Sequence, residues 1–309
     1  MASGFVFPGQ GSQSIGMLAD HIADASVVAQ CFAQAEDALG LPLLQYVTEG
    51  PESELNRTEI TQPAVLTASV ALWRLWLAEG GAKPVAMCGH SLGEYSALVC
   101  AGALEFRDAV KLVNLRGQLM QAAVPAGSGA MAAILGLEDS VVAQCCASVS
   151  GTVSPANFNS PGQIVIAGEA AAVDAAIAAC QAAGAKRAMK LAVSVPSHCA
   201  LMKGAASQFA DAIAATPFEL PSIPVIHNVD ASVSRDVGEL REKLLRQMSE
   251  PVQWTDCIAR MASLGVERAI ECGPGRVLAG LIKRIDRAID VAATDTKSAF
   301  GAALAGTSP

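Results

Sequence analysis

A possible nucleophile occupies a short, glycine-flanked stretch near residue 90. Gly89-His90-Ser91-Leu92-Gly93 has the form G-x-S-x-G and lies between a predicted strand and a predicted helix, the context that this motif requires. A tight strand-to-helix turn leaves no room for side chains at positions 89 and 93, which accounts for the two glycines. Such a turn pushes the Ser91 hydroxyl outward. It also aims the Leu92 N–H, at a helix N-terminus, toward an oxyanion forming beside Ser91.

Ser91 also has a purely structural interpretation. Ser91-Leu92-Gly93-Glu94 fits the pattern of a capping box, in which the serine would cap the helix. A bare G-x-S-x-G is a moderate signal by itself, and its position between strand and helix is what favours a nucleophile. We therefore predict that Ser91 is a nucleophile.

A serine hydroxyl needs a general base, and four histidines are candidates. His90 is next to Ser91, but neighbouring side chains on such a turn point apart. His21 lies in an early amphipathic segment, and His227 lies at the end of an apolar stretch that resembles a core strand. His198 lies where the chain is expected to return from a small unit to a large one, which is a natural wall for a cleft. It is the candidate base, although its local sequence is equally compatible with a histidine on a surface loop.

The order of these residues along the chain differs from that of common serine hydrolases. In ordinary α/β-hydrolases the triad runs Ser, acid, His, with the histidine late in the chain. Here more than 100 residues follow His198, and no Asp or Glu stands out as its partner. The topology is therefore predicted to differ from that of a standard esterase or lipase.

Arg116 lies in an otherwise mostly apolar helical stretch, residues 110–120. Its neighbours at i−3 and i+4 are Val113 and Met120, so its side chain is predicted to face the core. A buried guanidinium needs an anion, because an unpaired buried charge is costly. That anion could be an internal Glu or Asp or it could be a ligand, and the residues alone leave both open.

Alternating strand and helix patterns surround these residues and predict an α/β core with a largely parallel sheet. Strands are expected at 5–7, 85–88, 225–228 and 268–271, and helices at 26–39, 62–79, 92–101, 107–122, 199–215, 236–247, 254–263 and 275–287. The helix at 62–79 is expected to begin with Pro63 near its first position, where the missing N–H costs little. Residues 306–309 are expected to be frayed.

Residues 128–196 have a rhythm of their own and are predicted to form a small inserted domain. The expected order is strand 130–135, helix 138–149, strands 153–157 and 163–167, helix 170–183 and strand 186–193. The order β-α-β-β-α-β is that of a ferredoxin-like unit. We therefore predict a large α/β-hydrolase-like domain, residues 1–127 and 197–309, with an inserted ferredoxin-like domain, residues 128–196.

Composition narrows the class of protein. The chain has 309 residues, is 52% apolar and carries a net charge of −8, so its field repels nucleic acid and anionic membranes. The N-terminus lacks a basic region followed by a long apolar stretch, so no signal peptide is expected. Nine cysteines without a C-x-x-C pair are typical of buried, reduced thiols, and the histidines lack metal-ligand spacing. We expect a cytoplasmic, monomeric protein without a metal or a permanently bound cofactor.

Taken together, the motifs closely resemble one family, the malonyl-CoA:acyl carrier protein transacylases of bacterial type II fatty acid synthesis. The resemblance covers essentially the whole chain. In the first half it rests on Phe7-Pro8-Gly9-Gln10-Gly11-Ser12, Thr61-Gln62-Pro63-Ala64, Gly89-His90-Ser91-Leu92-Gly93-Glu94-Tyr95-Ser96 and Arg116-Gly117. In the second half it rests on Asn157-Phe158-Asn159-Ser160-Pro161-Gly162-Gln163, Val195-Pro196-Ser197-His198, Gln247 with Pro251-Val252-Gln253-Trp254, and Glu271-Cys272-Gly273-Pro274-Gly275. Ordered motifs at consistent spacing are far more specific than any single one.

The resemblance implies a role for each matching residue. Ser91 would attack the malonyl thioester and carry the acyl group, and His198 would be the general base and then the general acid. A main-chain carbonyl near Gln247 would orient the imidazole, so no carboxylate is required. The N–H groups of Gln10 and Leu92 would form the oxyanion hole.

The resemblance also implies two substrates used in turn, malonyl-CoA and the phosphopantetheine thiol of acyl carrier protein. Arg116 would bind the free malonyl carboxylate through two parallel hydrogen bonds. Carrier proteins of this kind are acidic, so docking on an acidic chain would use a local basic patch. Two patches are candidates, and each could equally be a solvated face: Lys186, Arg187 and Lys190 on the small unit, and Lys283, Arg284 and Arg287 on one face of the last predicted helix.

Other functions stay open at this level. The same Ser91 could serve an esterase or a thioesterase. A non-catalytic scaffold could keep the fold, although a scaffold has no need to keep Gln10, Ser91, Arg116 and His198 together. The acyl group could be another carboxyacyl group such as methylmalonyl, and the pathway could be polyketide synthesis.

Overall fold

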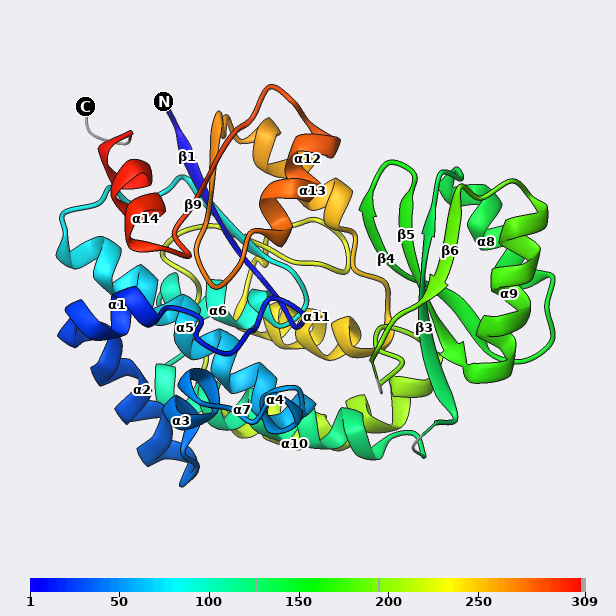
Figure 1. Cartoon of the computed structure of the whole chain (residues 1–309), viewed down its shortest axis with the longest axis horizontal. Helices are drawn as coiled ribbons and strands as arrows, with labels where there is room; N and C mark the ends of the chain where they lie inside the picture. The colour runs from blue at the N-terminus through cyan, green and yellow to red at the C-terminus, as the bar shows by residue number, and fades with distance from the viewer. Residues whose placement is uncertain (126, 194, 307–309) are drawn as a thin grey trace.

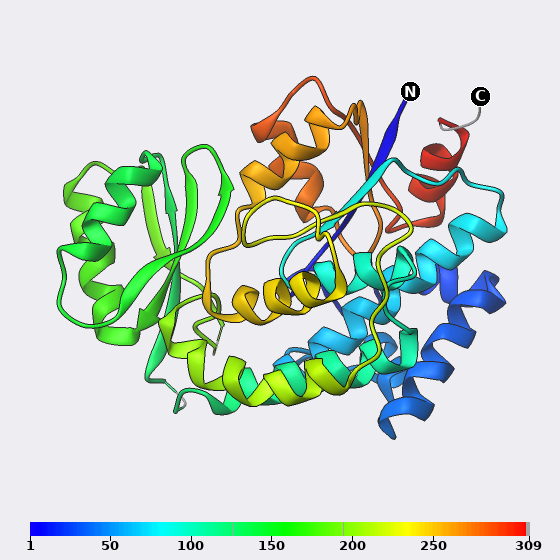
Figure 2. The same cartoon turned by 180° about the vertical axis from the view of Figure 1, so that it is seen from behind.

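Two β-sheets of different kinds organise the chain (Figure 1, Figure 2). The computed structural model describes residues 1–125, 127–193 and 195–306. One sheet has five strands in the order β7-β2-β1-β8-β9, and every neighbouring pair in it runs parallel. Its strands are β1 (Ser3–Phe7), β2 (Ala86–Gly89), β7 (Val225–Ile226), β8 (Arg268–Glu271) and β9 (Asp290–Ala293). The parallel sheet expected from the alternating pattern is present.

Helices cover the parallel sheet on both faces, because successive side chains of a strand point to opposite sides. Phe5 and Phe7 of β1 belong to one hydrophobic core, and Val6 between them belongs to another. The first core contains side chains from α2 (Ser26–Leu39), α5 (Thr58–Ala78), α6 (Gly93–Cys100), α7 (Phe106–Ala122), α10 (Lys203–Ala215), α11 (Val237–Ser249) and α14 (Lys297–Ala305). The second contains side chains from α12 (Trp254–Ser263) and α13 (Val277–Ile285).

Helix α5 begins four residues before the predicted position, so the expectation that Pro63 lies near its first position is wrong. A proline inside a helix leaves the carbonyl four residues earlier, here that of Glu59, without its usual N–H donor. The side chain of Asn114 on α7 donates to this carbonyl at 2.7 Å, which compensates the loss. The same close packing of α5 against α7 brings Gln62 into contact with Arg116.

The second sheet is antiparallel, with four strands in the order β4-β5-β3-β6. The elements follow the predicted order: β3 (Gly129–Leu135), α8 (Asp139–Ala147), β4 (Val153–Ser160), β5 (Gln163–Glu169), α9 (Ala170–Ala182) and β6 (Arg187–Lys190). Ile164 and Ile166 pack in a core with α8 and α9, whereas Val165 and Ala167 point to the opposite face. Because α8 and α9 cover only the outer face (Figure 1), the inner face is available to line a cleft.

Strand β4 is hydrogen-bonded to the segment between α11 and α12. The main chain of Val252 donates to Ala156 and accepts from Phe158, each at 2.9 Å. Thr255 Oγ1 also donates to the Phe158 carbonyl, at 3.1 Å. These bonds join the small sheet to the large unit.

Several boundaries differ from the prediction. Helix α13 ends at Ile285, so Arg287 lies in a turn beyond it and does not share a helix face with the other basic residues. The strands expected at 186–193 and 225–228 are shorter, and the helix expected from residue 199 begins as a 3₁₀ turn, η1 (Ala200–Met202). Residues 307–309, expected to be frayed, lie outside the described residues.

Among the described residues, five elements were not predicted at all. They are α1 (Ala19–Asp24), α3 (Leu43–Thr48), α4 (Glu52–Leu55), β9 and α14. Each has nine residues or fewer, so it offers little periodicity to a sequence pattern.

Candidate active site

The carboxyl ends of the parallel strands bring distant residues to one edge of the large sheet. Gln10 lies after β1, Ser91 after β2 and Asn228 after β7, and these strands are neighbours in the sheet. A cavity of about 240 Å³ opens at this edge, and the inner face of the small sheet lines its other side. The predicted site residues among its lining are Gln10, Ser91, Leu92, Arg116 and His198.

Ser91 lies on a tight turn whose backbone conformation and close packing restrict the residues that can form it. Its φ is +51°, in the left-handed region that is unfavourable for residues with a side chain. A Cβ at position 89 would lie 1.9 Å from atoms of Gly93, and one at position 93 would lie 2.0 Å from the Phe7 carbonyl oxygen. The close approach of β1, β2 and α6 therefore requires both glycines, as the motif predicted.

His198 lies between Ser91 and the main chain of Gln247. Its Nε2 is 2.8 Å from Ser91 Oγ, and its Nδ1 is 2.6 Å from the Gln247 carbonyl oxygen. A carbonyl oxygen only accepts, so Nδ1 carries the proton and Nε2 is left to accept from the serine hydroxyl. The pair therefore has the geometry of a serine with its general base, with a carbonyl in the place that a carboxylate takes in a triad.

Arg116 is 1% exposed and lies beside the same serine. Its Nη1 donates to Gln62 Oε1 at 2.9 Å, and its Nη2 donates to Gln247 Oε1 at 3.0 Å and to Ser91 Oγ at 3.3 Å. Within the described residues no ion pair involves Arg116, so the alternative of an internal Glu or Asp partner is wrong. Burial lowers the pKa of this guanidinium, because a charge is disfavoured in an apolar interior. A bound anion would counter this effect and stabilise the charged form.

The electrostatics keep His198 neutral. Burial is the first cause that lowers its pKa to about 3, and the positive charge of Arg116 is the second, while the bond to the Gln247 carbonyl opposes both. At neutral pH the imidazole is therefore unprotonated, which is the form that can accept a proton from Ser91.

The turn after β1 touches the nucleophile turn. A Cβ on Gly9 would lie 2.5 Å from the His90 carbonyl oxygen, so a glycine is needed there. Gln10 and Leu92, the two predicted oxyanion-hole residues, both line the cavity together with Ser91.

The other histidines have different surroundings. His90 points apart from Ser91, as predicted, and its Nε2 is 2.8 Å from Asn159 Oδ1 on β4. His21 is buried, with Nε2 3.1 Å from the Thr294 carbonyl oxygen. His227 is buried as well, with its Nδ1 2.7 Å from Glu94 Oε1.

From the sequence, Glu94 was interpreted only as part of a helix cap. Its side chain does not cap α6, so the capping-box interpretation is wrong. The carboxylate is fully buried and accepts from His227 Nδ1, from the Asn228 main-chain N–H and from Gln247 Nε2. A carboxylate in an apolar helical stretch is the same signal that singled out Arg116, and it could have found Glu94.

The two basic patches lie in different surroundings. Lys186, Arg187 and Lys190 are exposed on or next to the edge strand β6, and Lys190 pairs with Asp174 at 2.7 Å. Lys283, Arg284 and Arg287 are also exposed, and Arg284 Nη1 contacts Gln163 Oε1. Gln163 lines the cavity, so Arg284 of the second patch contacts a residue of the cavity wall.

Three further properties concern the described parts of the chain. There, none of the helices combines the length and apolar character needed to cross a membrane. In the same residues no group of three or more His, Cys, Asp or Glu side chains is arranged to hold a metal ion. The nine cysteines are free and buried.

Comparison with known proteins places this geometry in a family. The model of the acyl transferase domain family matches residues 4–300. The malonyl CoA-acyl carrier protein transacylase of Escherichia coli K12 is 55% identical over 302 residues, which are 97% of this chain and 98% of that protein. The transacylase of the same name from Bacillus subtilis is 44% identical over 286 residues, 92% of this chain and 90% of that protein. The chain belongs to the malonyl CoA-acyl carrier protein transacylase family.

Solved structures agree with this assignment. The malonyl-CoA:acyl carrier protein transacylase of Xanthomonas oryzae matches with a TM-score of 0.98 and 52% identity, covering 100% of this chain and 99% of that one. A malonyl-transacylase in complex with a type II PKS acyl-carrier protein matches with a TM-score of 0.98 and 52% identity, covering 99% of this chain and 100% of that chain. The family predicted from the ordered motifs is thus confirmed.

Proposed function

We propose that the chain transfers a malonyl group from malonyl-CoA to the phosphopantetheine thiol of acyl carrier protein, through an ester on Ser91. One observation supports malonyl as the acyl group. Arg116, buried and without a carboxylate partner among the described residues, lies 3.3 Å from the hydroxyl that also contacts His198. A serine and a base fit any acyl group, whereas a cation beside them fits an acyl group with a free carboxylate. The names of the relatives support the same choice.

In the first half-reaction Ser91 Oγ attacks the thioester carbonyl carbon while His198 Nε2 takes the hydroxyl proton. The oxygen that becomes negative is received by the main-chain N–H groups of Gln10 and Leu92. When the carbon–sulfur bond breaks, the imidazolium returns the proton to the leaving CoA thiolate. The products are free CoA and malonyl-Ser91.

In the second half-reaction the carrier-protein thiol gives its proton to His198 and attacks the ester carbonyl. The bond to Ser91 Oγ breaks, and the imidazolium reprotonates the serine. The Gln247 carbonyl holds the imidazole in the tautomer that both steps need. The two substrates use the same site in turn, and the product supplies extender units for fatty acid synthesis.

Arg116 selects the acyl group. Its planar guanidinium can bind a carboxylate through two parallel hydrogen bonds, which a neutral acyl chain cannot form. A hydrogen bond to a charged group contributes about 1.5–3 kcal/mol, which corresponds to roughly ten- to hundredfold selectivity.

We also propose a fold type for each of the two domains. A nucleophile on a strand-turn-helix supports a large α/β-hydrolase-like domain, residues 1–127 and 197–309. The sheet order β4-β5-β3-β6, with two helices on one face, supports a ferredoxin-like domain over 128–196.

The carrier protein is proposed to dock where basic side chains reach the cavity mouth. The contact between Arg284 and the cavity residue Gln163 favours the patch of Lys283, Arg284 and Arg287 over Lys186, Arg187 and Lys190, where one lysine is already paired. We further propose that the enzyme is a cytoplasmic monomer. Nine free, buried thiols support a reducing compartment.

Mass spectrometry of the intact protein after incubation with malonyl-CoA tests the proposal. The wild-type chain should gain one malonyl-sized adduct, and Ser91→Ala should gain none. Addition of phosphopantetheinylated carrier protein should remove the adduct and produce malonyl-carrier protein. Release of free malonate as the main product would instead indicate a hydrolase.

A further inference from the structure

A buried polar cluster lies behind the Ser91–His198 pair and has no part in the steps above. Glu94 on α6 and His227 after β7 are both 0% exposed, and Glu94 Oε1 lies 2.7 Å from His227 Nδ1. Burial of a carboxylate lowers the stability of the fold unless several donors hydrogen-bond to it. The donors around Glu94 therefore identify the groups that it can orient.

The second oxygen of Glu94 fixes the orientation of the Gln247 side chain. Glu94 Oε2 accepts from Gln247 Nε2 at 2.8 Å, and Gln247 Oε1 accepts from Arg116 Nη2 at 3.0 Å. An ionised carboxylate can only accept, so the amide must turn its NH₂ group toward Glu94 and its oxygen toward Arg116. The reversed amide would set two oxygens against each other and an NH₂ group against the guanidinium.

The same carboxylate acts on the nucleophile turn through two amides. Gln247 Nε2 also donates to the Ser91 carbonyl oxygen at 2.9 Å. Asn228, whose main-chain N–H donates to Glu94 at 2.9 Å, accepts the Ser91 N–H on its Oδ1 at 2.7 Å. The Glu94 carboxylate therefore makes no hydrogen bond to Ser91 or His198 itself, but both of its amide partners are hydrogen-bonded to Ser91.

We infer that Glu94 is a positioning residue, which orients the Gln247 amide so that Arg116 is held ready for the carboxylate of the acyl group. The inference rests on the proposed function, because it concerns the selection of a carboxylated acyl group. The negative charge of Glu94 also favours the charged form of Arg116, against the effect of burial on its pKa.

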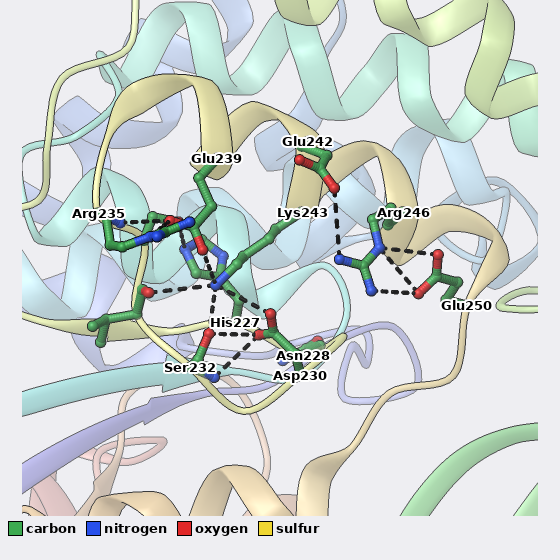
Figure 3. A network of polar contacts seen from close by, with 12 residues as sticks. His227, Asn228, Asp230, Ser232, Arg235, Glu239, Glu242, Lys243, Arg246 and Glu250 are labelled. Atoms are coloured by element: carbon green, nitrogen blue, oxygen red, sulfur yellow. Dashed lines mark hydrogen bonds and ion pairs between the residues drawn. The ribbon is translucent and has the colours of Figure 1, made fainter.

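A second network anchors the loop behind Glu94. His227 Nε2 lies 2.7 Å from Ser234 Oγ, and Ser234 belongs to the loop 229–235. Lys243 on α11, 2% exposed, contacts this loop through Asp230 at 3.2 Å and the Val233 carbonyl oxygen at 3.3 Å (Figure 3). It also pairs with Glu239 on its own helix, at 3.2 Å. Because α11 also carries Gln247, one helix fixes both the loop that supports His227 and the amide that Glu94 orients.

A merely structural role for Glu94 makes a different prediction. Loss of stability alone would lower the transfer of every acyl group by the same factor. Loss of the Gln247 orientation would weaken the hold on a carboxylate and leave a neutral acyl group less affected. The ratio of malonyl to acetyl transfer therefore separates the two roles.

The test compares the rates of adduct formation on Ser91 from malonyl-CoA and from acetyl-CoA. Glu94→Gln keeps the shape but can donate as well as accept, so the Gln247 amide is free to turn. The malonyl-to-acetyl ratio should fall by about tenfold or more, as expected for a weakened charge-assisted hydrogen bond. The matched control is Val28→Ala, which removes buried methyl groups from α2 and leaves a cavity in the core. It should lower the Tm and leave the ratio unchanged.

Equal losses for both acyl groups in Glu94→Gln would overturn the inference. If that variant does not fold, His227→Gln and His227→Leu replace it, because only the first can still donate to Glu94. The glutamine variant should keep the ratio within about twofold and the leucine variant should lower it several-fold; identical ratios would overturn the inference. A wild-type chain that forms no malonyl adduct would contradict the proposed function itself, before any variant is compared.

Discussion

The Nδ1 atom of His198 lies 2.6 Å from the main-chain oxygen of Gln247. A carbonyl in this place fixes the tautomer of the ring as well as a carboxylate would, but it carries only a partial negative charge. It therefore stabilises an imidazolium less than an aspartate does, and the nearby positive charge of Arg116 opposes an imidazolium further. The base is consequently weak in the free protein.

The pH dependence of acyl-enzyme formation should reflect this weak base. His198, with a pKa lowered to about 3, stays neutral far below the ordinary histidine pKa of 6.5. The kcat/KM for malonyl-CoA should therefore stay level from about pH 8 to about pH 5. A loss of about tenfold by pH 5.5, as for a histidine of ordinary pKa, would contradict the assignment.

The charge of Arg116 should be visible in the same profile. Arg116→Ala removes a cation that lowers the pKa of His198, so the pKa rises toward its ordinary value. The acid limb of the kcat/KM profile should move to higher pH in this variant. An unchanged profile would mean that burial alone depresses the pKa.

Arg116 should also control the choice of acyl group. Arg116→Ala should lower malonyl transfer by about ten- to hundredfold more than acetyl transfer, because only malonyl carries the carboxylate that the guanidinium binds. Initial rates with the two acyl-CoA substrates measure the ratio. Equal losses for both substrates would remove the assignment of Arg116 to the carboxylate.

The close packing at the nucleophile turn gives a prediction about stability. In Gly93→Ala the new Cβ would lie 2.0 Å from the Phe7 carbonyl oxygen, so the turn must move. The free energy of unfolding should fall by about 1–3 kcal/mol and the malonyl adduct should be lost. Gly204→Ala on α10 is the control, since its Cβ meets no atom within 4 Å, and it should keep both stability and adduct. An active Gly93→Ala would contradict the geometry of the turn.

Glu271 should make stability depend on pH. Burial raises its pKa to about 7 from 4.5, while the main-chain N–H groups of Leu278 and Ala279 oppose the shift. Between these values the folded chain holds a proton that the unfolded chain has lost, so the stability that this group contributes falls as pH rises through the window. Glu271→Gln removes the titration. The Tm of the variant relative to wild type should therefore rise between about pH 5 and about pH 8, and a constant difference would contradict the raised pKa.

Much of the fold was predictable because its signals are local. The bounds of α12 and β8 match the expected ones, and Gly89 and Gly93 indicated the tight turn between β2 and α6. Arg116 was predicted to be buried from its neighbours on one helix, which the structure confirms. The prediction for Pro63 was wrong, because the side chain of Asn114 on another helix donates to the carbonyl that Pro63 leaves without a partner inside α5.

The sequence by itself therefore determined the turn that carries Ser91, the alternation of strands and helices, and the burial of a charged side chain beside it. Only the tertiary structure decided the partners. Arg116 is bound by the amides of Gln62 and Gln247 and not by a carboxylate, and Glu94 holds Gln247 and does not cap its helix. The physical reason is the sheet order β7-β2-β1-β8-β9, which brings strand ends from distant parts of the chain to one edge. Periodicity reports which side chains are buried, and it contains no information on which of them meet.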